Sequence, residues 1–252
     1  MNVLITGAGA RVGRALAVEF AEKGYNIAIH YHHNQQGALE TLEHVQSLQK
    51  VDQSPSTKNA SFCVQADLSS PQGVYQLVEE LQKRWNSLDV LINNASLFNP
   101  VPFEEITPRQ WQAMLQVNLS SPFLLSQLCL PWLKQAPKPK GGVVIHLCDI
   151  GADRPLSGYT HYSVSKAGLV MLVKAMAVEL APEIRTLGIS PGQVAWPKGA
   201  DQNFKDHLLK RIPMSRSGSP KDVAVLARFL VEEAHYLNGE IIAVDGGLQC
   251  RY

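Results

Sequence analysis

The chain is poor in cysteine and carries almost no net charge. Its four cysteines, Cys63, Cys129, Cys148 and Cys250, lie far apart and form no Cys-x-x-Cys pair, which argues against a disulfide framework and against a zinc site. The formal net charge is +1, so no overall field would draw the protein to nucleic acid or to an anionic membrane. We therefore expect reduced thiols in the cytoplasm, no metal and no nucleic-acid partner. Any anion site must be local.

Long apolar runs are also missing. No stretch is long enough to span a bilayer, and the first residues enter a strand-like pattern without a basic leader. Internal repeats and low-complexity tracts are absent as well. The 252 residues, 45% of them hydrophobic, suit a single large core. We expect one domain over residues 1–252, in a soluble, unprocessed protein that does not associate with membranes.

The sequence does contain a regular alternation of short apolar runs with helical patterns. Parallel strands need crossover connections, and these are nearly always right-handed. The alternation therefore predicts a Rossmann-type, doubly wound α/β fold with about seven parallel strands and helices on both faces. The expected strands lie at residues 2–6, 26–31, 61–67, 88–96, 142–149, 184–190 and 240–246.

Helix starts are marked by Thr107 and Ser219, because each is a capping residue followed by proline at the first helical position. Two segments interrupt the alternation of strands and helices. Residues 46–60 are predicted to form a polar loop, and residues 196–213 are a candidate lid.

A glycine-rich turn follows the first expected strand. Gly7, Gly9 and Gly13 are spaced so that backbone N–H groups and a helix N-terminus can face a pyrophosphate. A second strand follows within about thirty residues, as a dinucleotide-binding unit requires. Arg11 and Val12 lie inside the same turn, and a guanidinium beside phosphates can form forked, charge-assisted hydrogen bonds. The pattern predicts a dinucleotide-binding site.

The end of the second expected strand carries no acid, although NAD sites usually offer an acid to the ribose there. Imidazoles and an amide at that place can donate hydrogen bonds to a 2′-phosphate. We therefore predict NADPH as the cofactor. The residues concerned are His30, Tyr31, His32, His33 and Asn34. After the third strand, Asp67 and Leu68 suit an adenine contact, and helix capping by Asp67 is the alternative.

Tyr162 and Lys166 lie four residues apart in a helical pattern, so both side chains project from one face. A tyrosine near its reference pKa of about 10 exchanges protons poorly at neutral pH. We expect the lysine cation to lower that pKa. Asp149 precedes the tyrosine by thirteen positions. By the same periodicities His146 and His161 face away, and we interpret both as structural.

These motifs occur together with "TGAGARVG", "NNAS", Asn118, "PG" and "DGG" in that order. With them the chain resembles the short-chain dehydrogenase/reductase family over essentially its whole length. The resemblance implies that Lys166 holds a nicotinamide at its ribose hydroxyls and that Tyr162 donates the proton. It implies that Asn118 supports a water-linked proton path and that Asn93 stabilises the central strand. Further cofactor contacts implied in this way are Asn94, Ala95, Ser96, Pro191 and Gly192.

The same resemblance implies a homotetramer. Its interfaces would use the helices near residues 108–133 and 159–181, and the apolar run "GLVMLVKAMAVELA" agrees with such a use. Burial of that run inside one subunit explains it equally well.

Most members of that family carry serine where this chain has Asp149. An ionised carboxylate cannot donate a hydrogen bond to a carbonyl. A partly buried acid with a raised pKa can instead protonate a ring nitrogen while the adjacent carbon accepts hydride. With Asp149 included, "TGAGARVG", "HYHHN", "NNASLF" and "CDIGADRPLSGYTHYSVSK" resemble the pteridine reductase subgroup.

This closer resemblance implies an NADPH-dependent reductase of dihydrobiopterin or dihydromonapterin, and of dihydrofolate. Phe98 would stack on the pterin opposite the nicotinamide, and Asp149 or Tyr162 would supply the proton. Ser96 and Arg11 would bond to the pterin or to a cofactor phosphate. Trp196 is a further substrate contact, at the start of a substrate loop. Two other functions stay open, namely a carbonyl reductase of the same family and a non-catalytic NADP(H)-sensing protein.

Overall fold

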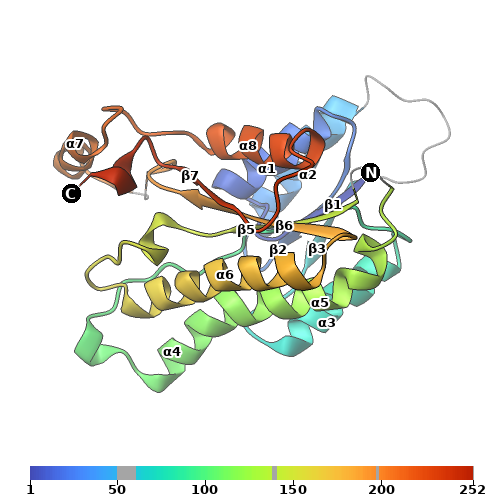
Figure 1. The fold of residues 1–252 in the computed structure, drawn as a ribbon, viewed down its shortest axis with the longest axis horizontal. Helices are drawn as coiled ribbons and strands as arrows, with labels where there is room; N and C mark the ends of the chain where they lie inside the picture. The colour runs from blue at the N-terminus through green and yellow to red at the C-terminus, as the bar shows by residue number, and fades with distance from the viewer. Residues whose placement is uncertain (50–60, 138–140, 197–198, 252) are drawn as a thin grey trace.

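The computed structural model describes residues 1–49, 61–137, 141–196 and 199–251. Within these ranges the centre of the molecule is one sheet of seven strands in the order β3-β2-β1-β4-β5-β6-β7 (Figure 1). Every neighbouring pair of strands is parallel. The strands are β1 (Asn2–Ile5), β2 (Asn26–Tyr31), β3 (Phe62–Gln65), β4 (Val90–Asn93), β5 (Gly142–Leu147), β6 (Ile184–Pro191) and β7 (Ile241–Val244). The predicted Rossmann-type fold is confirmed.

Helices cover both faces of this sheet. In Figure 1, α1, α2 and α8 lie above the sheet, and α3, α5 and α6 lie below it. The alternation of side chains along β1 shows why both faces need cover: Val3 and Ile5 enter one buried cluster, whereas Leu4 enters the other. The helices are α1 (Arg11–Ala21), α2 (Gln35–Gln49), α3 (Pro71–Gln82), α4 (Pro108–Leu115), α5 (Ser121–Leu133), α6 (Thr160–Glu179), α7 (Gln202–Arg211) and α8 (Pro220–Glu232).

Both predicted helix starts are confirmed. The Thr107 hydroxyl accepts a hydrogen bond from the backbone N–H of Gln110 at 3.3 Å, and Ser219 does the same for Asp222 at 3.3 Å. In each case the third helical residue bonds back to the backbone of the cap, and proline fills the first helical position. These local patterns therefore fix where α4 and α8 begin.

The two segments that interrupt the alternation differ from the prediction in part. Residues 46–49 belong to the last turn of α2 rather than to a loop, and the rest of that segment lies outside the described residues. The candidate lid contains α7, which begins after Asp201 caps it by accepting from the N–H of Phe204 at 2.7 Å. Residues 197–198 of the candidate lid lie outside the described residues.

The strand order reverses between β1 and β4, because β1 pairs with β2 on one side and with β4 on the other. Crevices at such switch points, at the carboxyl ends of the strands, are where open α/β sheets bind ligands. Most of the predicted site residues lie on the segments that follow these strand ends, whereas Tyr162 and Lys166 lie in α6 and Asn118 lies in a helical turn after α4. In the described ranges no helix is long and apolar enough to cross a membrane, and no cluster of three or more potential metal ligands is present.

Candidate active site

Asp149 and Tyr162 are in direct contact. Asp149 follows β5 and caps a short helical turn, its Oδ1 accepting from the backbone N–H of Gly151 at 2.6 Å. The Tyr162 hydroxyl, which α6 presents from its first turn, donates to Asp149 Oδ2 at 2.8 Å. Tyr162 is only 4% exposed. A carboxyl and a phenol that are thirteen residues apart in sequence thus form one proton-sharing pair.

The structure contradicts the prediction that Lys166 lowers the pKa of Tyr162. Burial, and then the charge of Asp149, raise the pKa of Tyr162 well above its ordinary value. Lys166 donates from Nζ to the carbonyl oxygen of Leu147 at 2.7 Å, and this Nζ lies 5.7 Å from the centre of the Tyr162 ring. Burial also lowers the pKa of Lys166. The lysine is therefore anchored to β5, and the carboxylate is the charge that acts on the phenol.

Replacing Asp149 by serine should lower the pKa of Tyr162, because it removes the largest contribution after burial. Tyrosinate absorbance, followed to the highest pH at which the protein stays folded, measures this if each curve is corrected with its Tyr162→Phe counterpart, and ionisation should begin at lower pH in D149S. The same replacement at Asp153, an exposed acid on the same loop, is the control and should leave the curve unchanged. Superimposable curves for D149S and the unmodified chain would contradict the coupling.

Asn118 lies in a π-helical turn, Gln116–Ser120, between α4 and α5. Its side chain bonds to both backbone groups of Leu97: Oδ1 accepts from the N–H at 2.8 Å, and Nδ2 donates to the carbonyl oxygen at 3.0 Å. The same Nδ2 lies 3.0 Å from the hydroxyl of Ser165 on α6, and Ser96 donates to Oδ1 at 3.2 Å. The amide therefore holds the loop after β4 against α6. Its role in a water-linked proton path stays a prediction.

Phe98 lies at the mouth of this site. Its ring stacks on that of Tyr159, with centroids 4.4 Å apart and planes 18° apart, and it meets Tyr162 edge-on at 4.7 Å. It is 47% exposed, so it does not fill the core. Tyr159 was missed in the sequence. The available signal was its place three residues before Tyr162, one helical turn away.

The glycine-rich turn fits a dinucleotide phosphate cradle. A Cβ on Gly13 would lie 2.3 Å from the carbonyl oxygen of Gly7, so α1 can start this close to the turn only without a side chain there. Gly7 itself has φ = +65°. Asn94 fixes the turn from the side of β4, donating from Nδ2 to the carbonyl oxygens of Thr6 at 2.8 Å and of Gly7 at 3.2 Å. Ala95 N–H donates to the Thr6 hydroxyl at 2.9 Å.

Arg11 adopts a left-handed backbone conformation, φ = +50°, at the first position of α1. Such a conformation is costly for a residue with a side chain and is often found at functional sites. The guanidinium donates from Nη2 to the carbonyl oxygen of Ala195 at 2.8 Å. Arg11 thus joins the glycine-rich turn to the segment after β6. There Trp196 packs edge-on against Phe204 of α7, with centroids 6.4 Å apart.

His30 points inward, contrary to its prediction as a phosphate donor, whereas Asn34 is exposed but its side-chain amide bonds to the backbone of Gly9 and Gly37. His30 is buried, its Nδ1 accepts from the N–H of Gly7 at 3.1 Å, and its Nε2 lies 3.1 Å from the carbonyl oxygen of Ala66. Burial lowers its pKa to about 4, which keeps the ring neutral at physiological pH. Asn34 caps α2 through Oδ1, which accepts from Gly37 N–H at 3.2 Å, and donates from Nδ2 to Gly9 at 3.2 Å. Both residues brace the glycine-rich turn.

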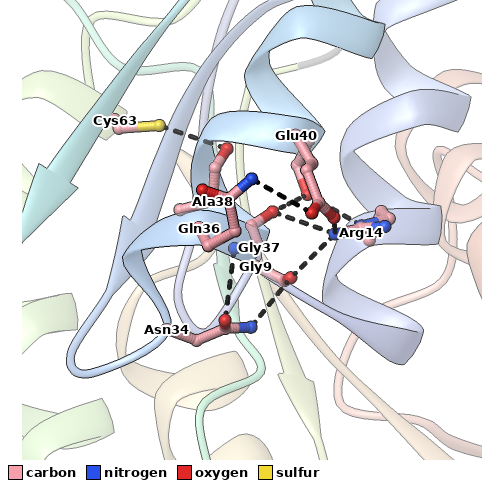
Figure 2. A network of polar contacts seen from close by, with 9 residues as sticks. Gly9, Arg14, Asn34, Gln36, Gly37, Ala38, Glu40 and Cys63 are labelled. Atoms are coloured by element: carbon pink, nitrogen blue, oxygen red, sulfur yellow. Dashed lines mark hydrogen bonds and ion pairs between the residues drawn. The ribbon is translucent and has the colours of Figure 1, made fainter.

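Figure 2 shows how α2 is fastened to that turn. The Arg14 guanidinium donates from Nη2 to the carbonyl oxygens of Gly9 at 3.3 Å and of Gly37 at 3.1 Å, and it pairs with Glu40 at 2.8 Å. A Cβ on Gly37 would lie 2.3 Å from the carbonyl oxygen of Gly9. Arg14 and Gly37 were missed in the sequence, because a single arginine or glycine in a helix gives no signal of a contact with a distant turn.

The other predicted contacts surround the same crevice. His32 and His33 remain outside, next to Asp67, whose Oδ1 accepts from Ser69 N–H at 2.8 Å. Asp67 is not the cap of α3, since Ser70 has that role. An adenine contact for Asp67 stays a prediction. Tyr31 and Val12 are half-buried, Leu68 is buried, and Pro191 and Gly192 end β6 beside the strand end of β7.

His146 and His161 are buried, as expected for structural residues. His146 Nδ1 lies 3.4 Å from the side-chain amide of Asn93, its register partner on β4, and Asn93 also donates to the Ser126 hydroxyl at 3.3 Å. Burial lowers the pKa of His146 to about 3. The pair joins β4 to β5 and to α5, below the site.

Comparison with known proteins identifies the family of this chain. A family model described as enoyl-(acyl carrier protein) reductase matches residues 7–249. The chain belongs to the short-chain dehydrogenase/reductase family. Members of this family are oxidoreductases that usually use NAD(H) or NADP(H), so the site described above is that of a short-chain dehydrogenase/reductase.

Three relatives illustrate the likeness. The chain is 31% identical over 255 residues to glucose 1-dehydrogenase 2 of Bacillus subtilis, covering 98% of this chain and 94% of that protein. It is 30% identical over 251 residues to a 3-oxoacyl-(acyl-carrier-protein) reductase of Staphylococcus epidermidis, covering 98% of each. The crystal structure of acetoin dehydrogenase from Enterobacter cloacae is similar with a TM-score of 0.86 at 28% identity, covering 99% of this chain and 96% of that one.

Proposed function

We propose that this short-chain dehydrogenase/reductase is an NADPH-dependent reductase that converts dihydropterins, and dihydrofolate, to their tetrahydro forms. The observation that carries the proposal is the 2.8 Å hydrogen bond between the Tyr162 hydroxyl and Asp149. It places two oxygen groups that can hold protons side by side at the carboxyl end of β5. A reduction that adds a proton to a ring nitrogen needs a proton source of this kind.

Bound NADPH would supply hydride, and the residues of the chain would manage the proton. With Asp149 ionised, proton loss from Tyr162 would leave a phenolate beside a carboxylate, and repulsion between like charges opposes this. Once Asp149 takes up a proton from solvent, the pair can pass one to the substrate. A carboxylic acid is a stronger acid than a phenol, so it can protonate the weakly basic nitrogen of a C=N bond. An ionised carboxylate would repel the charge that develops on a ketone oxygen.

The residues that would hold the dinucleotide are those that form the cradle. Gly7, Gly9 and Gly13 let the turn pack closely on its neighbours, so that its backbone would face the pyrophosphate. Lys166 would bind the nicotinamide ribose, and the backbone after β4 would line the cofactor. NADPH rather than NADH is favoured because no acid stands at the end of β2, where His32 and His33 face outward.

A second candidate function is carbonyl reduction. It is favoured by the names of two relatives, a 3-oxoacyl-(acyl-carrier-protein) reductase and an acetoin dehydrogenase, both of which act on carbonyl or alcohol groups. Asp149 argues against it, for the electrostatic reason given above.

The deciding assay follows NADPH oxidation by the purified protein without oxygen, with ascorbate present. The pterin arm contains 7,8-dihydrobiopterin, dihydromonapterin and dihydrofolate, and the carbonyl arm contains acetoin and a 3-oxoacyl thioester. Multiple turnover in the pterin arm supports the proposal and excludes a purely sensing role. Turnover in the carbonyl arm alone supports the alternative. If no pterin is turned over and methotrexate does not bind, the proposal is wrong.

Replacing Phe98 by alanine should raise KM for dihydrobiopterin about tenfold, because an aromatic stack contributes about 1 kcal/mol beyond the area it buries. The value of kcat should change less, since Phe98 contacts the flat ring and not the proton. Initial-rate kinetics measure both constants. Phe103→Ala removes a 74% exposed ring a few residues away and serves as the control. An unchanged KM in F98A would exclude stacking on this residue.

We also propose that the protein is a homotetramer in the cytoplasm. Val164, Met171 and Val178 lie at seven-residue spacing on α6 and are 43%, 61% and 82% exposed, so they form an apolar stripe on the surface of this helix. Sedimentation equilibrium tests the assembly, and a single species at the mass of one chain would exclude it.

A further inference from the structure

His32 and His33 form a solvent-facing pair at the end of β2. Their rings are stacked, with centroids 3.5 Å apart and planes 32° apart. The His32 side chain is 41% exposed and His33 is exposed as well. They follow β2 directly, next to the glycine-rich turn that Asn34 contacts through Gly9 (Figure 2). The two imidazoles therefore stand at the edge of the dinucleotide cradle.

This strand end contains no permanently charged cation. Residues 31–36 read "YHHNQQ", without lysine or arginine. His30, the third histidine of the strand end, is buried and neutral, because burial lowers its pKa to about 4. Positive charge in this segment can therefore come only from the imidazoles of His32 and His33, which become cations when they take up a proton.

The other charged groups near the pair either bond to other partners or carry negative charge. From α1 and α2, Arg14 and Glu40 form an ion pair at 2.8 Å, and Arg11 donates to a backbone carbonyl. After β3, Asp67 faces the pair, with Oδ1 3.7 Å from His32 Nδ1. Partial burial raises the pKa of Asp67. Hydrogen bonds from Ser69 and the electrostatic effect of the two imidazoles outweigh this and hold the pKa below its ordinary value. The carboxylate is thus the only fixed charge that faces the stacked rings from these described elements.

We infer that His32 and His33 couple the binding of the 2′-phosphate of NADPH to proton uptake, so that the preference for NADPH over NADH declines as the pH rises. The inference rests on the proposed use of NADPH. A phosphate monoester is a dianion above its second pKa of about 6, and a dianion beside an imidazole favours the imidazolium form.

Two stacked imidazolium ions repel each other, and an arriving dianion offsets that repulsion. The pair therefore takes up a proton when the phosphate binds. At higher pH this uptake costs more free energy, and without it the phosphate meets the negative charge of Asp67. NADH has a hydroxyl in place of the phosphate, so its binding has no such cost. The preference of this chain for NADPH over NADH would therefore decrease as the pH rises.

Isothermal titration calorimetry on the unmodified protein at fixed ionic strength tests the inference, with NADPH, NADH and 2′,5′-ADP as ligands. Between about pH 7 and pH 8.5, Kd for NADPH and for 2′,5′-ADP should rise by roughly tenfold per pH unit, the slope for one coupled proton. The Kd for NADH should change by less than about twofold. Buffers of different ionisation enthalpy should show uptake of up to about one proton with NADPH and none with NADH.

Variants show which side chains cause the pH dependence of NADPH binding. In His33→Gln the slope should fall and NADPH should bind weakly at every pH, whereas in His33→Arg binding should be tight and nearly independent of pH, because guanidinium stays charged. His44→Gln is the matched control, since His44 is exposed on α2, the helix that follows the pair, about 13 Å along its axis from the first turn. It should behave like the unmodified chain.

The outcomes distinguish failure of the inference from failure of the proposed function. If NADPH is preferred but its Kd does not depend on pH, or if the slope survives in both His32→Gln and His33→Gln, the inference is wrong and the proposed function stands. If NADH is preferred at every pH, or neither dinucleotide binds, both are wrong. The measurements on the unmodified chain decide the first point even where a variant does not fold.

Discussion

Turnover of 7,8-dihydrobiopterin should fall by about 100-fold or more when Asp149 is replaced by serine, with little change in KM. The reason is the pair that Asp149 forms with Tyr162. Serine supplies a hydroxyl that can orient a carbonyl, but it has no acidic proton for a ring nitrogen and no charge to hold the phenolic proton in place. Steady-state kinetics with NADPH in excess measure the loss.

Two companion variants distinguish the loss of the proton donor from a change in the local fold. Asp149→Asn keeps a side-chain oxygen that can accept from Gly151 N–H, the 2.6 Å bond that shapes the turn, but it cannot deliver a proton. It should lose as much pterin turnover as D149S. Asp153→Ser, on the same loop, should keep full activity. Ketone reduction by D149S should persist or increase, and undiminished pterin turnover in both Asp149 variants would show that Asp149 is not the proton donor.

The fold could be predicted because its determinants are local. Each strand is a short apolar run between turn residues, and the starts of α4 and α8 depend on groups three residues apart, Thr107 with Gln110 and Ser219 with Asp222. The handedness of the crossovers then restricts the orders in which the strands can lie. The placement of Asp149, Tyr162 and the glycine-rich turn at the strand ends follows in the same way, since these residues come directly after strands or in the helix that follows.

The remaining features of the site depend on contacts between distant residues. The direction of His30 is set in part by Ala66, 36 residues away just after β3, and a sequence pattern contains no information about that bond. The sign of the pKa shift of Tyr162 was wrong in the prediction because it depends on which neighbour reaches the hydroxyl. Asp149 reaches it, while Lys166 is held by the carbonyl of Leu147. The predicted helical spacing placed the lysine on the correct face but could not place its charge.

Arg185 is another residue whose contacts are distant in sequence, and we expect it to have a large effect on stability. It lies on β6, is buried, and points at the carboxyl end of α8 without a carboxylate partner in its hydrogen bonds. Its guanidinium donates to four backbone carbonyls: Nη1 to Leu230 at 2.9 Å, to Ala234 at 3.0 Å and to Leu237 at 3.4 Å, and Nη2 to Val231 at 3.3 Å. The carbonyls of Leu230 and Val231 are among those that the end of α8 leaves unpaired, at the negative end of the helix dipole, and the other two belong to the segment that follows the helix.

Replacing Arg185 by methionine should therefore lower the free energy of unfolding by about 3 kcal/mol or more. Methionine fills much of the space, but it leaves buried carbonyl oxygens without donors, each of which costs about 1–3 kcal/mol. Burial lowers the pKa of Arg185, yet an arginine remains charged in proteins, so the helix end also loses a cation. Thermal unfolding should shift down by roughly 6–12 °C for a chain of this size.

Equilibrium unfolding in urea measures the loss directly, with thermal scans as a second reading. Arg185→Lys keeps the charge but not the planar fork, so it should recover only part of the stability. Arg109→Met changes an exposed arginine at the start of α4 and should stay within about 0.5 kcal/mol of the unmodified chain. An Arg185→Met chain as stable as this control would show that water satisfies the end of α8 as well as the guanidinium does.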